Sequence, residues 1–161
     1  MSIGVFSLQR LFLDCEFTNF GGDLISLALV PEVGTGHCYI VLDSDQYGWP
    51  SPFVKQHILT NLQVDLTDHG RTLTREVAAR HVANYLHAHV KGDEALKVMA
   101  DWPEDLSHFL RLFGLGDGRT INIPAIDLEY RRIPGFATAT HSSSPHNALF
   151  DAVSLREFMT A

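Results

Sequence analysis

Two carboxylates stand two residues apart inside an apolar segment near the start of the chain. Asp14 and Glu16 alternate there with Leu13, Cys15 and Phe17. In a β-strand, side chains at positions i and i+2 leave the same face, so both carboxylates would lie close together. Like charges in such proximity raise each other's pKa unless a cation or a proton separates them. The pair therefore predicts a site for a divalent metal ion held by oxygen ligands.

Further acids along the chain could complete this site. Asp101 follows a predicted strand, Asp105 lies in the first turn of the next predicted helix, and Asp151 lies on the last predicted helix, after His146. Taken alone, Asp105 is explained by the favourable interaction of an acid with a helix N-terminus. Asp151 alone is explained as a solvent-exposed helix residue. Only their combination with the first pair favours a shared metal site.

The hydrophobic pattern predicts an α/β domain that positions these acids. Three strands come first, joined by short turns as an antiparallel meander, at residues 10–17, 24–31 and 37–42. Two further strands are predicted at residues 95–100 and 120–128. Helices are predicted at residues 53–62, 72–89, 103–113 and 146–159, with a serine-rich loop at 135–145. Residues 1–161 are expected to form one domain, a central five-stranded mixed sheet flanked by helices.

Composition narrows the class of protein. The 161 residues carry a net charge of −7 with histidine neutral, which disfavours extensive electrostatic wrapping of a duplex. The two cysteines, Cys15 and Cys38, are expected to be free thiols in a reducing cytoplasm. No apolar window approaches the length of about 18 residues that a membrane span needs, so no membrane span is expected.

The histidines of the helix at residues 72–89 do not form a metal site by their spacing. His87 and His89 diverge around the helix, and the positions that could pair with His81 one turn later hold Asn84 and Tyr85. These histidines are predicted to be surface residues.

The acidic motifs together resemble the DEDDh-type 3′-5′ exonucleases of the ribonuclease H-like superfamily. The D-x-E motif is Asp14-Cys15-Glu16, the second motif lies within residues 101–105, and the H-x-x-x-x-D motif is His146 to Asp151. These motifs occur in the family's order over nearly the whole chain. The small size and the second motif look most like the compact mycobacterial-type exoribonuclease branch, with ribonuclease T and oligoribonuclease more distant. The chain departs from the family at Phe17-Thr18-Asn19, where Thr-Thr-Gly is more usual.

The resemblance implies a ribonuclease H-like fold and a two-metal-ion mechanism. Asp14, Glu16, Asp105 and Asp151 would bind two Mg²⁺ or Mn²⁺ ions, with Asp14 as the bridging ligand and Glu16 on the ion that activates water. Many relatives have asparagine where this chain has Asp101. Asp101 is therefore the alternative to Asp105 as the metal ligand of the second motif. His146 would be the general base, since an imidazole with a pKa near 6.5 can accept a proton at neutral pH. The expected products are nucleoside 5′-monophosphates released from a 3′ end.

The expected substrate is single-stranded nucleic acid, with RNA preferred over DNA because of the resemblance. Phe17, Thr18 and Trp102 are predicted to contact it, the aromatic rings by stacking on terminal bases. Relatives of this kind are often homodimers. Two other functions stay open, a phosphohydrolase acting on small nucleotides such as dinucleotides and a catalytically weak nucleic-acid-binding scaffold.

Overall fold

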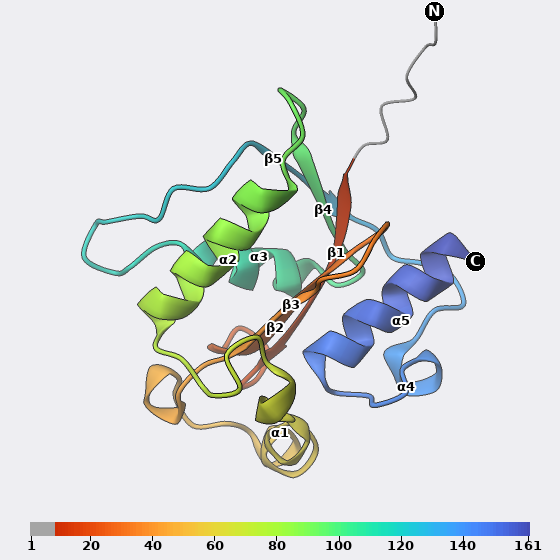
Figure 1. The fold of residues 1–161 in the computed structure, drawn as a ribbon. Helices are drawn as coiled ribbons and strands as arrows, with labels where there is room; N and C mark the ends of the chain where they lie inside the picture. Colours follow the sequence, from red (N-terminus) through yellow and green to blue (C-terminus); the bar gives the residue numbers. More distant parts are fainter. Residues whose placement is uncertain (1–8) are drawn as a thin grey trace, which may run out of the picture.

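The computed structural model describes residues 9–161, which form an α/β fold around one five-stranded mixed sheet (Figure 1). The strands are β1 (Arg10–Phe17), β2 (Leu24–Pro31), β3 (Cys38–Val41), β4 (Leu96–Ala100) and β5 (Ile126–Tyr130). Their order in the sheet is β3-β2-β1-β4-β5. The first three strands pair antiparallel, whereas β4 pairs parallel with both β1 and β5. The predicted mixed sheet with an antiparallel meander is confirmed.

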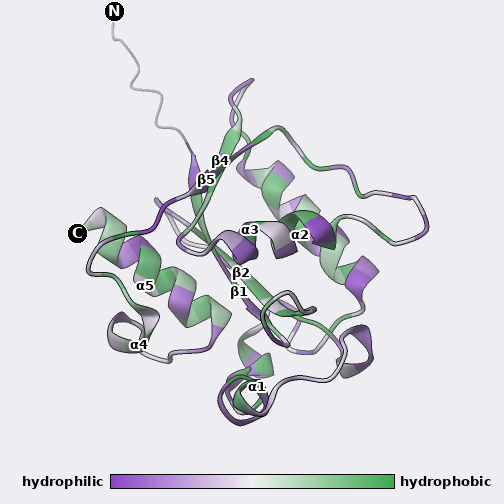
Figure 2. Ribbon diagram, turned by 180° about the vertical axis from the view of Figure 1, so that it is seen from behind, coloured by the Kyte–Doolittle hydropathy of each residue, from purple (hydrophilic) through white to green (hydrophobic). Residues whose placement is uncertain are grey.

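Helices cover both faces of the sheet. They are α1 (Pro52–His57), α2 (Arg75–His89), α3 (Pro103–Leu112), α4 (Thr138–His141) and α5 (Ala148–Thr160). Short 3₁₀ turns lie at Ser44–Gln46, Leu59–Asn61 and Val64–Leu66. Helices α2 and α3 lie on one side of the strands and α5 on the other (Figure 1). Each long helix carries both green and purple stretches in Figure 2, as expected for helices that cover a sheet and face solvent.

The alternation along β1 separates a hydrophobic core from the acidic face. Leu11, Leu13 and Cys15 pack into the core beneath α2 and α3. Phe12 points to the opposite face, where it packs with Met99 and Leu155 and is fully buried. Asp14 and Glu16 share that face of β1 by the period-2 alternation. Phe12 itself therefore lines no cleft beside the acids, because α5 covers it.

The predicted bounds of β1 and β2 agree with the structure, and those of several later elements differ. The fifth strand begins at Ile126, after Pro124, and extends to Tyr130. Proline has no N–H to donate to a neighbouring strand, so pairing with β4 begins beyond it. The helix predicted at residues 53–62 ends at His57 and continues as a 3₁₀ turn. The loop predicted at residues 135–145 contains the short helix α4.

The parallel pairing of β1 and β4 determines where the acids lie. The last paired residues of these strands are Phe12 and Met99. Asp14, within β1, and Asp101, directly after β4, each lie two residues beyond this pair, where the parallel pairing of the two strands ends toward their carboxyl termini. Ligand sites of open α/β sheets form at such ends, next to the point where the strand direction changes. Among residues 9–161, no helix is both long and apolar enough to cross a membrane.

Candidate metal centre

The side chains of Asp14 and Glu16 are nearly inaccessible to solvent although both are carboxylates. Asp14 is 9% exposed and Glu16 is 7% exposed. Both residues belong to β1, which is hydrogen-bonded to β2 on one side, so the strand holds them rigidly. Helix α5 packs against β1 and β2 and closes the face from which they project. The sequence prediction that the two acids share one buried strand face is therefore supported by this geometry.

The second motif brings two aspartates toward Asp14. Asp105, in the first turn of α3, is 2% exposed, whereas Asp101 is partly exposed at the end of β4. The Cys15 thiol donates a 3.7 Å hydrogen bond to the carbonyl of Asp105, which fixes the start of α3 against β1. Asp105 points inward, as predicted. Asp101 also lies at the site, so the structure contains both acids between which the sequence left a choice.

The third motif places Asp151 in the same region through the start of α5. The Asn147 side chain caps this helix by accepting hydrogen bonds from the amides of Leu149 and Phe150. Asp151, in the first turn, is 3% exposed and faces β1. The helix prediction is confirmed, and the explanation of Asp151 as a solvent-exposed residue is excluded.

The four predicted ligands and Asp101 form two overlapping groups. Carboxylate oxygens of Asp14, Asp101 and Asp105 lie within 4.8 Å of one another. A second group, with the same limit of 4.8 Å, contains Asp14, Glu16 and Asp151. Asp14 is common to both groups, the position that a ligand shared between two ions must occupy. The oxygen-only donor set suits hard divalent cations.

The carboxylates destabilise one another's charged forms. Burial raises the pKa of Asp14 well above its ordinary value, and the charges of Asp105, Asp151 and Glu16 raise it further. Burial, together with Asp151, raises the pKa of Glu16 to about 8. The pKa of Asp105 is likewise raised well above its usual value, first by burial and then by Asp101 and Glu16. Burial raises the pKa of Asp151 to about 6, although hydrogen bonds from Ser142 and from the His146 amide act to lower this pKa.

These carboxylates fit divalent cations by their unused oxygen atoms. Oδ2 of Asp14 and Oδ1 of Asp151 are buried and have no hydrogen-bond partner. Within residues 9–161, neither residue forms an ion pair with lysine or arginine, and the same holds for Glu16 and Asp105. Unpaired buried charge is costly unless a cation compensates it. The residues present therefore suit the Mg²⁺ or Mn²⁺ ions expected from the sequence.

His146 lies at the mouth of this acidic cluster. Its backbone N–H donates a 3.1 Å hydrogen bond to Oδ2 of Asp151. Its ring lines a cavity of about 330 Å³ together with Glu16, Phe17 and Phe53. Burial and the nearby His57 lower the pKa of His146 below 6.5. The imidazole is therefore neutral at pH 7 and can accept a proton.

The segment that carries His146 is held in place by hydrogen bonds. The Asn61 side chain donates to the carbonyl of Pro145 at 3.0 Å, and the Ser144 hydroxyl donates to Asn61 at 3.1 Å. The Asn147 side chain donates to the carbonyl of Asn61 at 2.7 Å. These contacts hold the backbone of His146, which has a φ of 66°, although it directly follows the predicted serine-rich loop.

The three predicted substrate contacts differ in their surroundings. Phe17 lines the cavity and stacks on His108, with ring centroids 4.7 Å apart. Trp102 is 39% exposed and borders a hollow of about 210 Å³ beside Asp101. Thr18 is only 2% exposed, and its hydroxyl accepts a 2.9 Å hydrogen bond from the Asp23 amide. The Thr18 hydroxyl therefore closes the turn after β1, and its contact with substrate stays a prediction.

Other residues at the site were missed by the sequence reasoning. Phe53 packs edge-on against the His146 ring, with centroids 5.1 Å apart, and tilts against His57. Glu104 accepts a 2.5 Å hydrogen bond from the Gly21 amide and so ties the turn after β1 to α3. Arg132 borders the same hollow as Trp102, and its charge acts against burial, which raises the pKa of Asp101. Phe53 and Arg132 belong to no motif, and only folding brings them to the acids. Glu104 lies within the segment of the second motif, but its contact with the turn after β1 also depends on folding.

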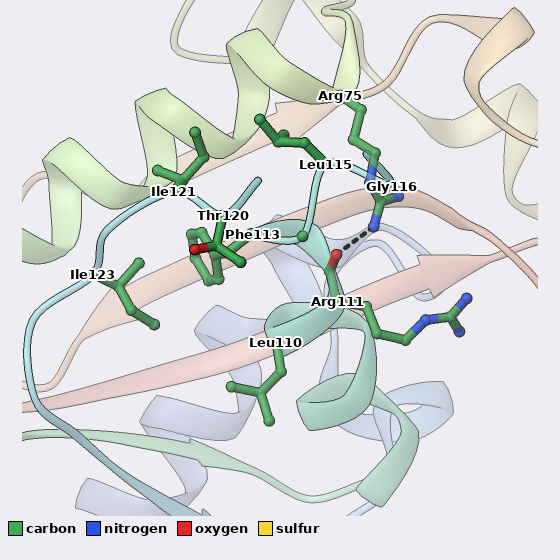
Figure 3. A pocket seen from close by; sticks show the side chains of 10 residues that line it. Arg75, Leu110, Arg111, Phe113, Leu115, Gly116, Thr120, Ile121 and Ile123 are labelled. Atoms are coloured by element: carbon green, nitrogen blue, oxygen red, sulfur yellow. Dashed lines mark hydrogen bonds between the residues drawn. The ribbon is translucent and has the colours of Figure 1, made fainter. Parts of the chain in front are cut away.

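A larger hollow of about 690 Å³ lies at the opposite end of α3 from Asp105 (Figure 3). Leu110, Phe113 and Ile121 give it apolar walls, and Arg75 lies at its edge. The Arg75 guanidinium donates a 2.6 Å hydrogen bond to the carbonyl of Arg111. Its lining residues include no acid or histidine, whereas Glu16 and His146 both line the 330 Å³ cavity beside the acidic cluster.

Comparison with known proteins adds no relative that could identify the chain, since no protein-family model and no curated protein matches it.

Proposed function

We propose that this protein is a metal-dependent 3′-5′ exonuclease that hydrolyses single-stranded RNA. One observation carries the proposal, namely that Asp14, Glu16, Asp105 and Asp151 converge from a strand and two helices with His146 beside them. Mutual repulsion makes this arrangement unfavourable for folding alone. Strain of this kind is expected where function requires it. The 3′-5′ polarity and the preference for RNA rest on the motif resemblance.

In the proposed reaction, the four carboxylates bind metal ions and His146 accepts a proton. Asp14, Glu16, Asp105 and Asp151 would hold two Mg²⁺ or Mn²⁺ ions, with Asp14 common to both. When bound, such ions activate a water molecule and stabilise the leaving 3′ oxygen. His146 accepts one proton of the attacking water at a ring nitrogen, since its lowered pKa keeps it neutral. A bond forms between the water oxygen and phosphorus, and the bond from phosphorus to the 3′ oxygen breaks.

The cavity beside Glu16 is proposed to receive the terminal nucleotide. Its volume of about 330 Å³ lies at the lower end of the range of small-ligand pockets. Phe17 and Phe53 offer aromatic faces for a base, and stacking of this kind tolerates any sequence. Arg132, at the neighbouring hollow, would contact a backbone phosphate.

The sheet order supports assignment to the ribonuclease H-like fold. Three antiparallel strands followed by two parallel strands, with the first strand central, match the arrangement that the motif resemblance implies. A homodimer is also proposed on the resemblance, and a monomer in sedimentation at micromolar concentration would contradict it.

The decisive experiment follows a 5′-labelled single-stranded RNA incubated with the protein and Mn²⁺. A ladder that shortens from the 3′ end is expected for the wild type. The ladder should be absent for Asp14→Asn and His146→Ala and present for Asp93→Asn, an acid on an exposed turn. Asp93→Asn changes the net charge by the same amount as Asp14→Asn, so it controls for charge.

Two parallel assays separate the alternatives. RNA binding without cleavage in Mn²⁺ or Mg²⁺ would identify a scaffold. Cleavage of dinucleotides without cleavage of longer RNA would identify a small-nucleotide hydrolase. Equal rates of cleavage on DNA and RNA of one sequence would contradict the preference for RNA but not the exonuclease activity.

A further inference from the structure

Outside the acidic cluster, three side chains with different metal-binding atoms meet beside the edge of the sheet. Cys38 is the first residue of β3, Asp68 lies in the turn after the 3₁₀ segment Val64–Leu66, and His81 lies on α2. Their sulfur, carboxylate and imidazole donor atoms all lie within 4.8 Å of one another. The spacing of histidines on α2 excluded a site made by that helix alone. The partners of His81 come instead from two other segments.

We propose that Cys38, Asp68 and His81 form a zinc site that fastens the edge of the sheet. A thiolate combined with an imidazole and a carboxylate is a donor set typical of zinc, whereas Mg²⁺ and Ca²⁺ prefer oxygen alone. Three protein ligands leave one tetrahedral position for water or a further side chain. Water would occupy this position, and His69 packs edge-on against His81 nearby, with ring centroids 4.5 Å apart.

The donors are arranged in advance by contacts that do not depend on a metal. Asp68 accepts a 3.2 Å hydrogen bond from the Tyr39 amide through Oδ1, and Oδ2 lies 2.6 Å from Nε2 of His81. Cys38 is fully buried, and the side chains of Asp68 and His81 are 19% and 27% exposed. The site is thus reachable from solvent on one side and closed on the other. Metal binding would release the thiol proton of Cys38 to solvent and replace the direct contact between Asp68 and His81.

A second observation supports a ligand here. The Tyr85 hydroxyl is buried, has no hydrogen-bond partner, and lies close enough to Cys38 and Asp68 to feel their charges. A buried hydroxyl usually finds a partner. A water molecule in the fourth metal position would supply one.

The place in the fold gives the site a structural purpose. β3 is an edge strand, and unpaired edge groups promote pairing with other chains unless something covers them. The segment from Asp68 to Leu73 covers this edge, since the amides of Asp68 and Leu73 donate to the carbonyls of Tyr39 and Val41. A metal ion joining Cys38, Asp68 and His81 would fix this cover to β3 and α2 together.

Cobalt substitution tests the proposal in the full chain. Protein purified without a histidine tag is stripped with a chelator and titrated with Co²⁺, whose bonds to thiolate give charge-transfer absorption in the near ultraviolet. We expect this absorption to saturate at one equivalent and to disappear when Zn²⁺ is added. It should be absent in Cys38→Ser, and His81→Gln should weaken Co²⁺ binding by at least about tenfold, the lower limit for losing a supporting group.

Matched variants separate this site from the acidic cluster. Cys15→Ala removes the other thiol, which lies beside Asp105, and should leave the absorption intact. His87→Gln, an exposed histidine on the same helix, should also leave it intact. Circular dichroism of metal-free Cys38→Ser checks its folding, and His81→Gln keeps the test valid if Cys38→Ser does not fold. Absorption that is missing in the wild type, lost in Cys15→Ala or unchanged in His81→Gln would overturn the proposal.

Discussion

The backbone N–H of His146 donates a 3.1 Å hydrogen bond to the side chain of Asp151, five residues later. The proposed base and a proposed metal ligand thus form one local unit at the start of α5. This contact holds His146 in a left-handed conformation, with φ of 66°, which non-glycine residues rarely adopt. Strained backbone persists where the surrounding contacts enforce it, and such positions concentrate at functional sites.

The first prediction distinguishes the two aspartates of the second motif. Asp105→Asn should lower kcat/KM for RNA by at least about 10³-fold, because it removes a buried ligand. Asp101→Asn should lower it by only about tenfold, as expected for a supporting group. Single-turnover cleavage of a labelled RNA measures both effects. A larger loss in Asp101→Asn than in Asp105→Asn would reverse the assignment.

The second prediction concerns stability without metal. Asp14→Asn removes one of several repelling buried acids, so it should raise the free energy of unfolding in chelator by about 1 kcal/mol. For a domain of this size, that corresponds to about 2–4 °C in Tm. Adding Mn²⁺ should raise the Tm of the wild type more than that of the variant, because binding stabilises the folded state. Asp93→Asn should behave like the wild type in both conditions, and a destabilised Asp14→Asn in chelator would refute the repulsion argument.

The third prediction is the pH dependence of that stability. Burial raises the pKa of Glu16 from 4.5 to about 8, so the folded protein binds more protons than the unfolded chain between these values. The contribution of Glu16 is therefore fully present below pH 4.5 and is lost as the pH rises through about 8. Asp151, with a pKa of about 6, acts in the same direction at lower pH.

Thermal melts in chelator should accordingly show Tm falling from about pH 5 to about pH 8. The decline should be smaller in Glu16→Gln, which cannot ionise. With saturating Mg²⁺ the decline should diminish or reverse, because the metal binds the ionised carboxylates. A Tm in chelator that rises over this interval in the wild type, but not in Glu16→Gln, would contradict the raised pKa.

The fourth prediction tests His146 as the base through its neighbour His57. Burial lowers the pKa of His146 first, and the nearby His57 lowers it further. His57→Gln should therefore raise the pKa of His146 and move the acid limb of the kcat/KM profile to higher pH. The rate at high pH should change little. His87→Gln is the control, and an acid limb that does not respond to His57→Gln would argue against His146 as the titrating group.

The fifth prediction concerns the aromatic residues at the cavity. Phe17→Ala should raise KM for RNA by roughly 5- to 150-fold, since stacking of one base is worth about 1–3 kcal/mol. His108→Gln should have a smaller effect in the same direction, because His108 supports the Phe17 ring from behind. Leu110→Ala, at an exposed position later on α3, controls for general effects on that helix. A loss in kcat with unchanged KM in Phe17→Ala would assign this ring to positioning of the site instead.

Local sequence patterns determined much of the fold. The apolar alternation of residues 10–17 fixed β1, and the helical spacing of residues 72–89 predicted α2, which begins at Arg75 after its cap Thr74. The strand predicted at residues 120–128 was displaced, because pairing with β4 depends on which residues lie opposite one another across the sheet. The cover over Phe12 was likewise not predictable, because it depends on where α5 packs.

For the site, the sequence by itself determined that Asp14 and Glu16 share one strand face, because side-chain alternation is a local property. Only the tertiary structure decided that Asp105 and Asp151 reach Asp14, since no local rule fixes the distance between a strand and two helices. The same limit explains why the hydrogen bond of the Thr18 hydroxyl was not predicted, since the turn that contains it closes only in the folded chain. It also explains why the cluster of Cys38, Asp68 and His81 was not predicted, since these residues belong to three separate segments and meet only through packing.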